Sequence, residues 1–396
     1  MEKFDVNGVG VPNGNYFGMP YQADDCPVVL VSVPWDATVS YSAGTAMGPK
    51  AIIDASIQVD LFDEGIKNSE NLKIGTGRTF LAGAVENSDP AANKNKKASE
   101  KRGDNVKFFA AEDYIELISK DARAKAEKVI DALAKGKRLS DMQKLINEVN
   151  ASSREMNSIV EYICMGYNQE NKIVGVVGGE HSVCFGAVQA ASEMVARQVK
   201  KAGKGATAQL GVLQIDAHAD LRKAYEGFEY SHASIMYNIL HKIKGVSTLC
   251  QVGIRDFCKE EYDLMSSNKS LQVFTDAGIK SALYGGRMTW DEICNGIIDV
   301  LPDNVYVSFD VDGLEPSCCP NTGTPVPGGL TYDGAVYLLR KLSGRKRIIG
   351  FDLCEVAPAC AKGKFAAGGE KNEWDANVGA RLLHKLCLFA VRSLQK

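Results

Sequence analysis

The stretch LGVLQIDAHAD, residues 210–220, joins a mostly apolar run to three potential metal ligands. The run 210–215 predicts a strand buried on both faces, because such runs without alternation are typical of the interior of a parallel sheet. Asp216, His218 and Asp220 follow at alternate positions, and side chains two residues apart on an extended chain point the same way. The stretch therefore predicts a metal site at the carboxyl end of a buried strand.

Two further apolar runs end in residues of the same kind. Residues 305–309 lead into Asp310 and Asp312, and residues 173–177 lead into a GGEHS segment that carries His181. Parallel strands end at one edge of a sheet, where α/β folds bind their ligands. Four aspartates gathered there would repel one another strongly without a cation. Four carboxylates and two imidazoles suit two divalent ions better than one, and this thiolate-free donor set favours manganese over nickel, cobalt or iron.

Alternation of apolar runs with helical stretches predicts an α/β fold, a three-layer αβα sandwich with a central, mainly parallel sheet. Strands are expected at residues 28–33, 173–177, 210–215, 248–253, 305–309 and 347–353. Helices are expected at residues 183–200, 233–243, 290–300 and 333–342. All three metal-type segments then lie at the same edge of one sheet.

The chain is expected to form a single domain over residues 1–396, with an N-terminal extension at 1–25 and a charged, partly helical insertion at about 82–149. Residues 87–102 are rich in Lys, Asn, Ala and Ser and predict an exposed loop or arm. Residues 113–149 alternate charged and apolar positions at helical spacing. No function is legible in this insertion.

Composition excludes several classes of partner. Forty-six Lys and Arg against 49 Asp and Glu give a formal net charge of −3, so we expect no nucleic-acid partner. No apolar stretch approaches the roughly 20 residues that span a bilayer, and the first residues lack the apolar core of a signal peptide, so we expect no membrane and a cytoplasmic location. The 11 cysteines form no Cys-x-x-Cys pair and are expected to be buried hydrophobes in a reducing compartment. Adjacent Cys318 and Cys319 are the exception, because they follow the Asp310 strand end.

Five segments together resemble the ureohydrolases, the family of arginases, agmatinases, formimidoylglutamases and guanidine hydrolases. Three of the segments are the metal-type motifs GGEHS at 178–182, DAHAD at 216–220 and SFDVD at 308–312. GTAMGPKAI at 44–52 resembles the family's early glycine-rich turn, and TGTPVPGGL at 322–330 resembles its loop after the last metal motif. The resemblance covers roughly residues 25–80 and 170–395, in the family's order, and implies an arginase-like fold.

The resemblance implies two divalent ions, most simply Mn²⁺, with Ni²⁺ as the alternative. One ion would be held by His181, Asp216, Asp220 and Asp310, and the other by His218, Asp216, Asp310 and Asp312. All six positions carry the expected residue type, which implies an active enzyme rather than a non-catalytic family member. Glu180 and Glu315 stand where the family more often has Asp, and both positions lie outside the ligand set.

The implied reaction is hydrolysis of a guanidino group to urea and an amine. By the resemblance, His232 carries a proton to the leaving amine, and Glu355 orients the guanidinium through paired hydrogen bonds. Without the resemblance, His232 is more simply a helix-start or surface histidine, and Glu355 an ordinary loop carboxylate. Asp352 is the neighbouring alternative to Glu355, with a structural role as its simpler interpretation.

The residues around the ligands favour an agmatinase-like substrate. Arg222 follows the DAHAD motif where arginases tend to place a small polar residue that contacts the amino-acid carboxylate. Val326 stands where agmatinases commonly have Glu, and the chain exceeds a minimal agmatinase, so a guanidine hydrolase is the first alternative. Arginase and formimidoylglutamase follow. Substrate contacts are predicted for Glu355, Arg222 and Val326, and the resemblance implies a homo-oligomer, trimer or hexamer.

Two other hydrolase classes use similar ligands. A two-metal phosphatase would normally carry an Asn-His-Asp or Asn-His-Glu segment, and the sequence contains neither. A single-zinc deacylase would not need both His181 and Asp220. The motif set therefore favours the ureohydrolase interpretation.

Overall fold

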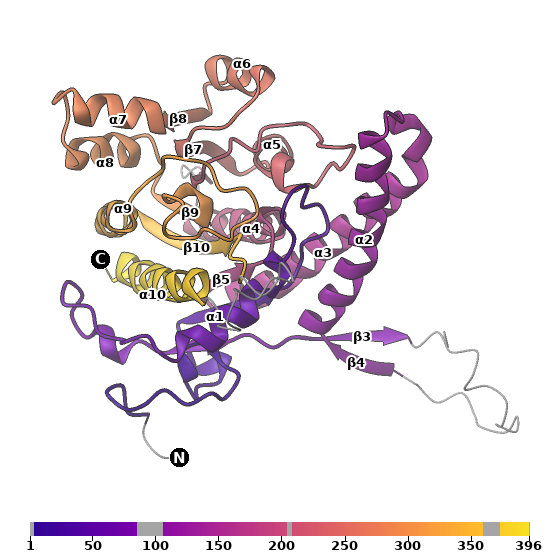
Figure 1. The fold of residues 1–396 in the computed structure, drawn as a ribbon. Coiled ribbons are helices and arrows are strands. Elements are labelled where there is room, and N and C mark those ends of the chain that lie inside the picture. Colours follow the sequence, from indigo (N-terminus) through magenta and orange to yellow (C-terminus); the bar gives the residue numbers. More distant parts are fainter. Residues whose placement is uncertain (1–3, 85–105, 204–207, 359–372, 396) are drawn as a thin grey trace, which may run out of the picture.

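An eight-stranded sheet, in which every neighbouring pair is parallel, forms the centre of the computed structural model, which describes residues 4–84, 106–203, 208–358 and 373–395 (Figure 1). In spatial order the strands are β2 (Ile74–Thr76), β1 (Val28–Val33), β5 (Ile173–Gly178), β10 (Arg347–Cys354), β9 (Asn304–Asp310), β6 (Leu210–Ile215), β7 (Val246–Ile254) and β8 (Leu271–Thr275). The last strand of the chain thus lies in the middle of the sheet, between β5 and β9.

Successive strand residues feed two separate apolar cores. Val28 and Leu30 of β1 belong to one buried cluster, whereas Val29 and Val31 belong to the other. This division follows from the period of two in a strand, which sends alternate side chains to opposite faces. A sheet with both faces buried needs apolar residues at nearly every position, which explains the continuous runs in the sequence.

Helices cover both faces and complete three layers (Figure 1). The first cluster includes residues from α1 (Gly48–Ser56), α7 (Asp276–Tyr284), α8 (Trp290–Asp299), α9 (Tyr332–Arg345) and α10 (Trp374–Leu394). The second includes residues from α2 (Ala111–Ala134), α3 (Gln143–Gln169), α4 (Cys184–Ala202) and α5 (Ile235–Lys242), with α6 (Lys259–Ser267) packed at its margin. The predicted αβα sandwich is confirmed, and the eight-stranded sheet is wholly parallel.

The region between β2 and β5 holds a feature that the sequence did not predict. β3 (Phe80–Ala84) and β4 (Val106–Ala110) pair as an antiparallel ribbon separate from the main sheet, and two long helices follow, α2 and α3 (Figure 1). The arm predicted at 87–102 lies within 85–105, outside the described residues. The predicted end of the insertion, near residue 149, falls inside α3, which continues to Gln169 and contributes Met156 and Val160 to the second core.

The N-terminal segment packs against the main domain. Tyr16, Phe17 and Met19 are buried in the first core, and the backbone N–H of Phe17 donates to Ser56 Oγ in α1 at 2.7 Å. The segment predicted as an extension, 1–25, is therefore tied to the fold over the part that is described.

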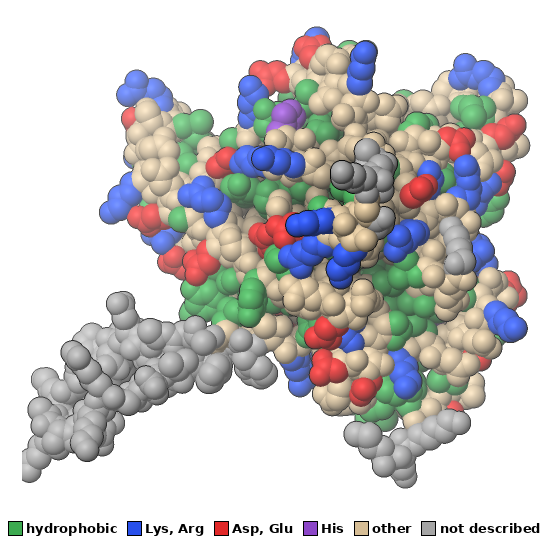
Figure 2. Space-filling model, turned by 180° about the vertical axis from the view of Figure 1, so that it is seen from behind, with side chains coloured by type: hydrophobic (Ala, Val, Ile, Leu, Met, Phe, Trp, Pro, Cys, Tyr) green, Lys and Arg blue, Asp and Glu red, His purple; other side chains and the backbone are tan. Residues whose placement is uncertain are grey.

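Surface charge is mixed on the face shown in Figure 2, where Lys and Arg side chains alternate with Asp and Glu. Among the described residues, no helix is both long and apolar enough to cross a membrane.

Short 3₁₀ turns complete the elements. Three of them lie directly after the predicted site segments or within them: η6 (His181–Val183), η7 (His232–Ser234) and η8 (Val311–Gly313).

Candidate metal centre

Four strands deliver the predicted site residues to one edge of the sheet. β5 ends three residues before His181, β6 ends just before Asp216, and Asp310 is the last residue of β9. β10 lies between β5 and β9 in the sheet order and ends just before Glu355. The carboxyl ends of adjacent parallel strands coincide, so residues distant in sequence meet at this edge.

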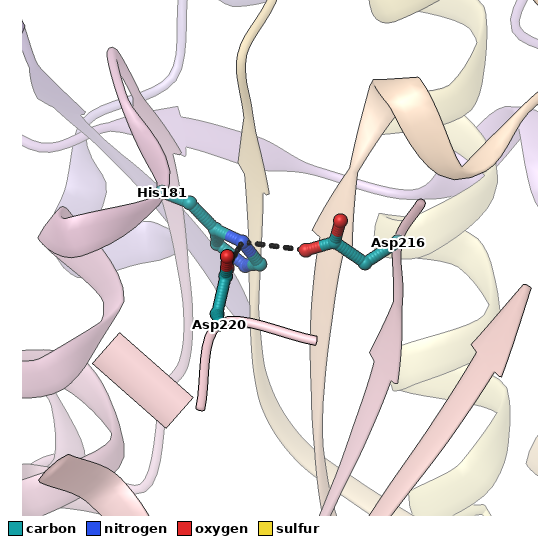
Figure 3. A group of neighbouring side chains, drawn as sticks. All are labelled: His181, Asp216 and Asp220. Atoms are coloured by element: carbon teal, nitrogen blue, oxygen red, sulfur yellow. Dashed lines mark hydrogen bonds and ion pairs between the residues drawn. The ribbon is translucent and has the colours of Figure 1, made fainter. Parts of the chain in front are cut away.

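His181 is the centre of one group of ligands. Its Nδ1 lies 2.9 Å from Asp216 Oδ2 and 3.1 Å from Asp220 Oδ2 (Figure 3). Asp310 Oδ2 lies 3.6 Å from the same nitrogen. The ring is almost fully buried, with 1% of its side chain exposed. Three carboxylates therefore converge on one ring nitrogen inside the protein.

His218 forms a second group with Asp216 and Asp312. Its Nδ1 lies 3.0 Å from Asp312 Oδ2 and 3.6 Å from Asp216 Oδ1. The His218 side chain is 25% exposed, and its Nε2 lies 3.9 Å from the carboxylate of Asp256. Asp216 belongs to both groups, each of which brings one potential ligand atom per residue within 4.8 Å of the others.

In each of three aspartates Oδ1 accepts a backbone hydrogen bond and Oδ2 faces a histidine nitrogen. Oδ1 of Asp216 accepts from the backbone N–H of His218 at 2.6 Å, and Oδ1 of Asp310 accepts from that of Asp312 at 2.8 Å. Oδ1 of Asp312 accepts from the N–H of Ala217 at 3.0 Å, which ties the β9 segment to the β6 segment. The Oδ2 atoms of all three face the histidine nitrogens, an arrangement suited to ligands held in place before an ion arrives.

This donor set fits divalent cations better than protons. A ring N–H can donate one good hydrogen bond, yet three carboxylates surround Nδ1 of His181. Ser308 Oγ donates to Asp352 at 3.1 Å and lies 2.8 Å from His181 Nε2, so Nε2 can donate to this hydroxyl and leave the Nδ1 lone pair for an ion. Ligand atoms on one ion with bonds of about 2.1 Å at right angles lie about 3 Å apart, as these do.

The pKa shifts at His218, Asp220 and Asp310 all favour the protonated form, which indicates an excess of negative charge in the cluster. Burial disfavours a protonated ring at His218, but Asp312 and Asp216 outweigh it and raise the pKa to about 12. Burial and then the charge of Asp216 raise the pKa of Asp220 to about 7, and burial with Asp312 and Asp216 holds the pKa of Asp310 well above its usual range. A cation between these groups would relieve the same repulsion without protonating any of them.

Buried amides and carboxylates support the ligands from behind. Gln214 Nε2 donates to Asp216 Oδ2 at 2.7 Å, and Gln251 Nε2 in turn donates to Gln214 and to the carbonyl of Ala219. Glu180 accepts from Trp35 Nε1, from Ser182 Oγ and from both the N–H and the hydroxyl of Thr38. These partners fix the loops on either side of the ligands, as supporting residues do in metal sites.

Two site residues adopt left-handed backbone conformations that non-glycine residues rarely use. Asp220 has φ of 54° and Glu355 has φ of 65°. Such strain persists where surrounding contacts over-determine the geometry, and it clusters at functional positions. Glu355 follows β10 directly, and both side chains are buried.

A cavity of about 190 Å³ opens above the His218 group. Its lining comes from separate segments: Ser40, His218, Ala219, Asp220, Arg222, Tyr225, His232, Ala233, Asp256, Phe257, Glu261 and Thr324. Arg222 lies over the Tyr225 ring at 5.0 Å, and its Nε is 3.9 Å from Glu261 Oε2. Three acids therefore line the cavity, and its one arginine lies close to one of them.

The predicted catalytic and substrate residues occupy different places around this cavity. His232 lines it, with Nδ1 buried and without a hydrogen-bond partner among the described residues, and burial followed by the charge of His218 lowers its pKa to about 4. Glu355 is buried beside the ligands instead, where Oε1 accepts from the backbone N–H of His181 at 2.9 Å. Arg222 lines the cavity, but Val326 does not, and its carbonyl accepts from Arg255.

Several residues at the site escaped prediction because their signals are not local. Ser40, Tyr225, Phe257 and Thr324 reach the cavity from loops far apart in sequence. Asp256 could have been suspected from its place two residues after β7, the strand that pairs with β6. Cys318 and Cys319 are both buried in the first core and do not line the cavity.

Known proteins resemble this chain in sequence and in fold. A family model described as "Arginase family" matches residues 26–387. An N(1)-aminopropylagmatine ureohydrolase of Synechocystis sp. is 28% identical over 334 residues, 84% of this chain and 82% of the relative. A protein of the same name from Thermus thermophilus is 32% identical over 219 residues, 55% of this chain and 66% of the relative. The crystal structure of agmatine ureohydrolase of Thermoplasma volcanium shares the fold, with a TM-score of 0.59 and 19% identity over 94% of this chain and 93% of that one.

Proposed function

The chain belongs to the arginase family and is a ureohydrolase, a hydrolase of amidine C–N bonds, and from this premise we propose that its substrate is agmatine or a closely related guanidino amine. Water adds to the guanidinium carbon, the bond from that carbon to the substituted nitrogen breaks, and the products are urea and the free amine. The names of the relatives from Synechocystis and Thermus support an amine rather than an amino acid as the second product.

Two divalent ions, most simply Mn²⁺, are proposed as the resident metals. His181, Asp216, Asp220 and Asp310 would hold one ion, and His218, Asp216, Asp310 and Asp312 the other. The predominance of carboxylate oxygens favours manganese, and nickel is the alternative to test. When bound, the ions supply Lewis acidity that lowers the pKa of water towards neutrality and stabilises negative charge at the reacting carbon.

The protein's own groups position the substrate and move protons. His232 lines the cavity as a neutral ring with Nδ1 free of hydrogen bonds to the described residues, so it can take a proton from the attacking water and pass it to the leaving nitrogen. Oε1 of Glu355 accepts a hydrogen bond from the backbone N–H of His181. Glu355 therefore helps to fix this proposed ligand and places a carboxylate beside the metal centre. We propose that its second oxygen orients the guanidinium.

The acidic lining of the cavity is the observation that carries the choice of substrate. Asp220, Asp256 and Glu261 line it, and Arg222 lies 3.9 Å from the carboxylate of Glu261. Such a lining suits a dication with a guanidinium and a distal ammonium, and it disfavours the carboxylate of an amino acid. Asp256, with 66% of its side chain exposed, is the proposed partner of the distal ammonium.

Free guanidine is the second candidate, favoured by the size of the cavity. About 190 Å³ is below the roughly 300–1,000 Å³ of sites for drug-sized ligands, so a very small substrate would fill it well. Guanidine would release urea and ammonia by the same steps.

Urea release from agmatine, arginine, free guanidine and 4-guanidinobutyrate, with Mn²⁺ or Ni²⁺ supplied, tests the proposal. We expect the highest kcat/KM with agmatine. The Asp256→Asn variant should raise KM a few-fold for agmatine and leave KM for guanidine unchanged, because only agmatine carries a distal charge. Preference for guanidine would establish the second candidate, and urea from none of the four with either metal would overturn the ureohydrolase assignment.

Assembly and location complete the proposal. We propose that the chain forms a trimer or hexamer in the cytoplasm, as its resemblance to ureohydrolases implies, and that its small-molecule partner is the guanidino substrate. Light scattering on the purified protein tests the assembly, with a monomeric mass as the contradicting result.

A further inference from the structure

Arg255 follows β7 directly, and its guanidinium is surrounded by backbone carbonyls. It donates to the carbonyl oxygens of Asp312 at 2.6 Å, Leu314 at 3.1 Å, Val326 at 3.0 Å and Gly253 at 3.1 Å. Because this guanidinium donates to backbone carbonyls and not to a carboxylate, its role is to hold the backbone in place rather than to neutralise an acidic side chain.

The residue joins three loops that build the site. Its own backbone N–H donates to the carbonyl of Ala217 at 2.8 Å, between the ligands Asp216 and His218. Its side chain holds the loop of Asp312 and the loop that carries Val326 and Thr324. One residue thus ties two ligand loops to the loop that supplies a wall of the cavity.

The partner loop is shaped to receive the guanidinium. Gly328 and Gly329 adopt φ of 97° and 103°, where side chains are strongly disfavoured. A Cβ on Gly329 would lie 2.6 Å from the carbonyl oxygen of Leu314 and 3.0 Å from a terminal nitrogen of Arg255. Only glycine allows the loop to approach this closely.

Among the residues that the side chain contacts, the one potential metal ligand belongs to the His218 group. Asp312 belongs to the His218 group, and Thr324 lines the cavity above that group. The His181 group takes its nearest ligand, Asp216, from a loop that Arg255 holds through its backbone only, and a change of side chain leaves that bond in place. The guanidinium therefore acts on the half of the centre that faces the cavity.

We propose that Arg255 is a positioning residue that sets Asp312 and the 322–330 loop, and thereby the affinity of the His218 half for its ion. The proposal rests on the metal site of the proposed function, but its test needs no turnover. Lysine keeps the charge but lacks the separate Nε and Nη1 donors, which reach the carbonyls of Val326 and Gly253, so Arg255→Lys cannot reproduce the whole set of carbonyl contacts.

Calorimetric titration of the metal-free protein with Mn²⁺ tests the proposal. For Arg255→Lys we expect the weaker of the two binding events to lose about 10–100-fold in affinity, as for supporting residues at other metal sites, while the tighter event is unchanged. Arg340→Lys is the matched control, because Arg340 pairs with Asp63 away from the site, and both of its binding events should equal those of the wild type. With a substrate that the enzyme turns over, KM of Arg255→Lys should rise more than kcat falls.

Equal weakening of both events in Arg255→Lys, or no weakening, would overturn the proposal. Should this variant fail to fold, Gly329→Ala is used in its place, because it pushes the loop from the guanidinium while Arg255 remains. Gly329→Ala must then show the same selective loss, and an unchanged titration would contradict the role of Arg255. Failure of every substrate in the urea assay would leave these titrations, and the conclusion drawn from them, unaffected.

Discussion

The two halves of the metal centre differ in how each holds its histidine. His181 is buried, and its Nε2 lies 2.8 Å from Ser308, which donates in turn to the buried carboxylate of Asp352. His218 is 25% exposed, and its Nε2 faces the exposed carboxylate of Asp256 at 3.9 Å. One half is fixed within the sheet, whereas the other opens to the cavity.

This difference separates two tasks. A ligand held by buried hydrogen bonds costs little to keep in place when an ion binds, so the His181 half should hold its ion more tightly. We expect the open His218 half to admit substrate and exchange water, and its ligands to be held by fewer buried hydrogen bonds. The comparison predicts two unequal ions, and each of the following variants breaks or sharpens it.

Replacement of Asp216, the residue common to both halves, should have the largest effect. Asp216→Asn removes a charge that faces both His181 and His218, so we expect loss of both ions and a fall in activity beyond the 10–100-fold typical of supporting residues. Metal content measured by mass spectrometry after gel filtration checks this. Asp54→Asn, at an exposed surface pair, is the control, and retention of one ion in Asp216→Asn would argue against a shared ligand.

Removal of the Ser308 hydroxyl should have the second-largest effect, and this effect should be on ion binding by the buried His181 half. Ser308→Ala leaves Nε2 of His181 without its hydrogen-bond partner, and we expect the tighter binding event for Mn²⁺ to weaken about 10–100-fold. Ser343→Ala removes a buried hydroxyl in α9, away from the ligands, and serves as control. A shift confined to the weaker event would reverse the assignment of the two halves.

Another buried histidine, His384, sharpens the comparison, because it does not belong to either group of carboxylates. Burial, followed by the charge of Lys385, lowers its pKa to about 4, whereas the carboxylates hold the pKa of His181 well above its ordinary value. The unfolded chain therefore takes up a proton at His384 first as pH falls. Stability from this residue is complete above about pH 6.5 and is lost between there and pH 4, by up to about 1.4 kcal/mol per pH unit.

Urea unfolding of the wild type and of His384→Leu from pH 7.5 to 4.5 measures this. The free energy of unfolding should fall more steeply with decreasing pH in the wild type than in the variant. His241→Leu, at an exposed histidine, is the matched control for the loss of a histidine ring. Equal slopes in His384→Leu and the wild type would show that the buried ring does not titrate as its surroundings imply.

The smallest effect on metal binding is expected at Asp256. Its carboxylate is 66% exposed and 3.9 Å from His218 Nε2, so Asp256→Asn should weaken the second ion by no more than a few-fold. The titration that reports on Ser308→Ala also measures this variant, with Asp263→Asn on α6 as control. A loss as large as that of Ser308→Ala would mean that the open half is as firmly supported as the buried one.

The clustering of the candidate ligands could be predicted from sequence because their signal is local. A buried strand followed by acids and histidine at alternate positions, as in 210–220, fixes both the edge of the sheet and the direction of the side chains. The predicted strand bounds at 28–33 and 210–215 are confirmed to the residue, since fully buried strands are continuous apolar runs. The three-layer architecture follows from the same runs.

The rest depends on contacts between distant segments. Nothing local places β10 between β5 and β9, yet that position brings Asp352 behind Ser308 and Glu355 beside His181. The β3–β4 ribbon pairs two short segments that lie far apart in the sequence, so neither segment alone indicates the pairing. The cavity wall and the carbonyl contacts of Arg255 arise only when loops from several strand ends meet, so no single stretch announces them.

Manganese stoichiometry with paramagnetic resonance of the loaded protein tests the central claim, a centre for two adjacent ions, most directly. The geometry predicts two Mn²⁺ per chain that bind with unequal affinity, and a spectrum of a coupled pair once the second ion enters, because Asp216 faces both histidines. One ion per chain at saturation, or two ions whose spectra remain those of isolated Mn²⁺, would contradict it.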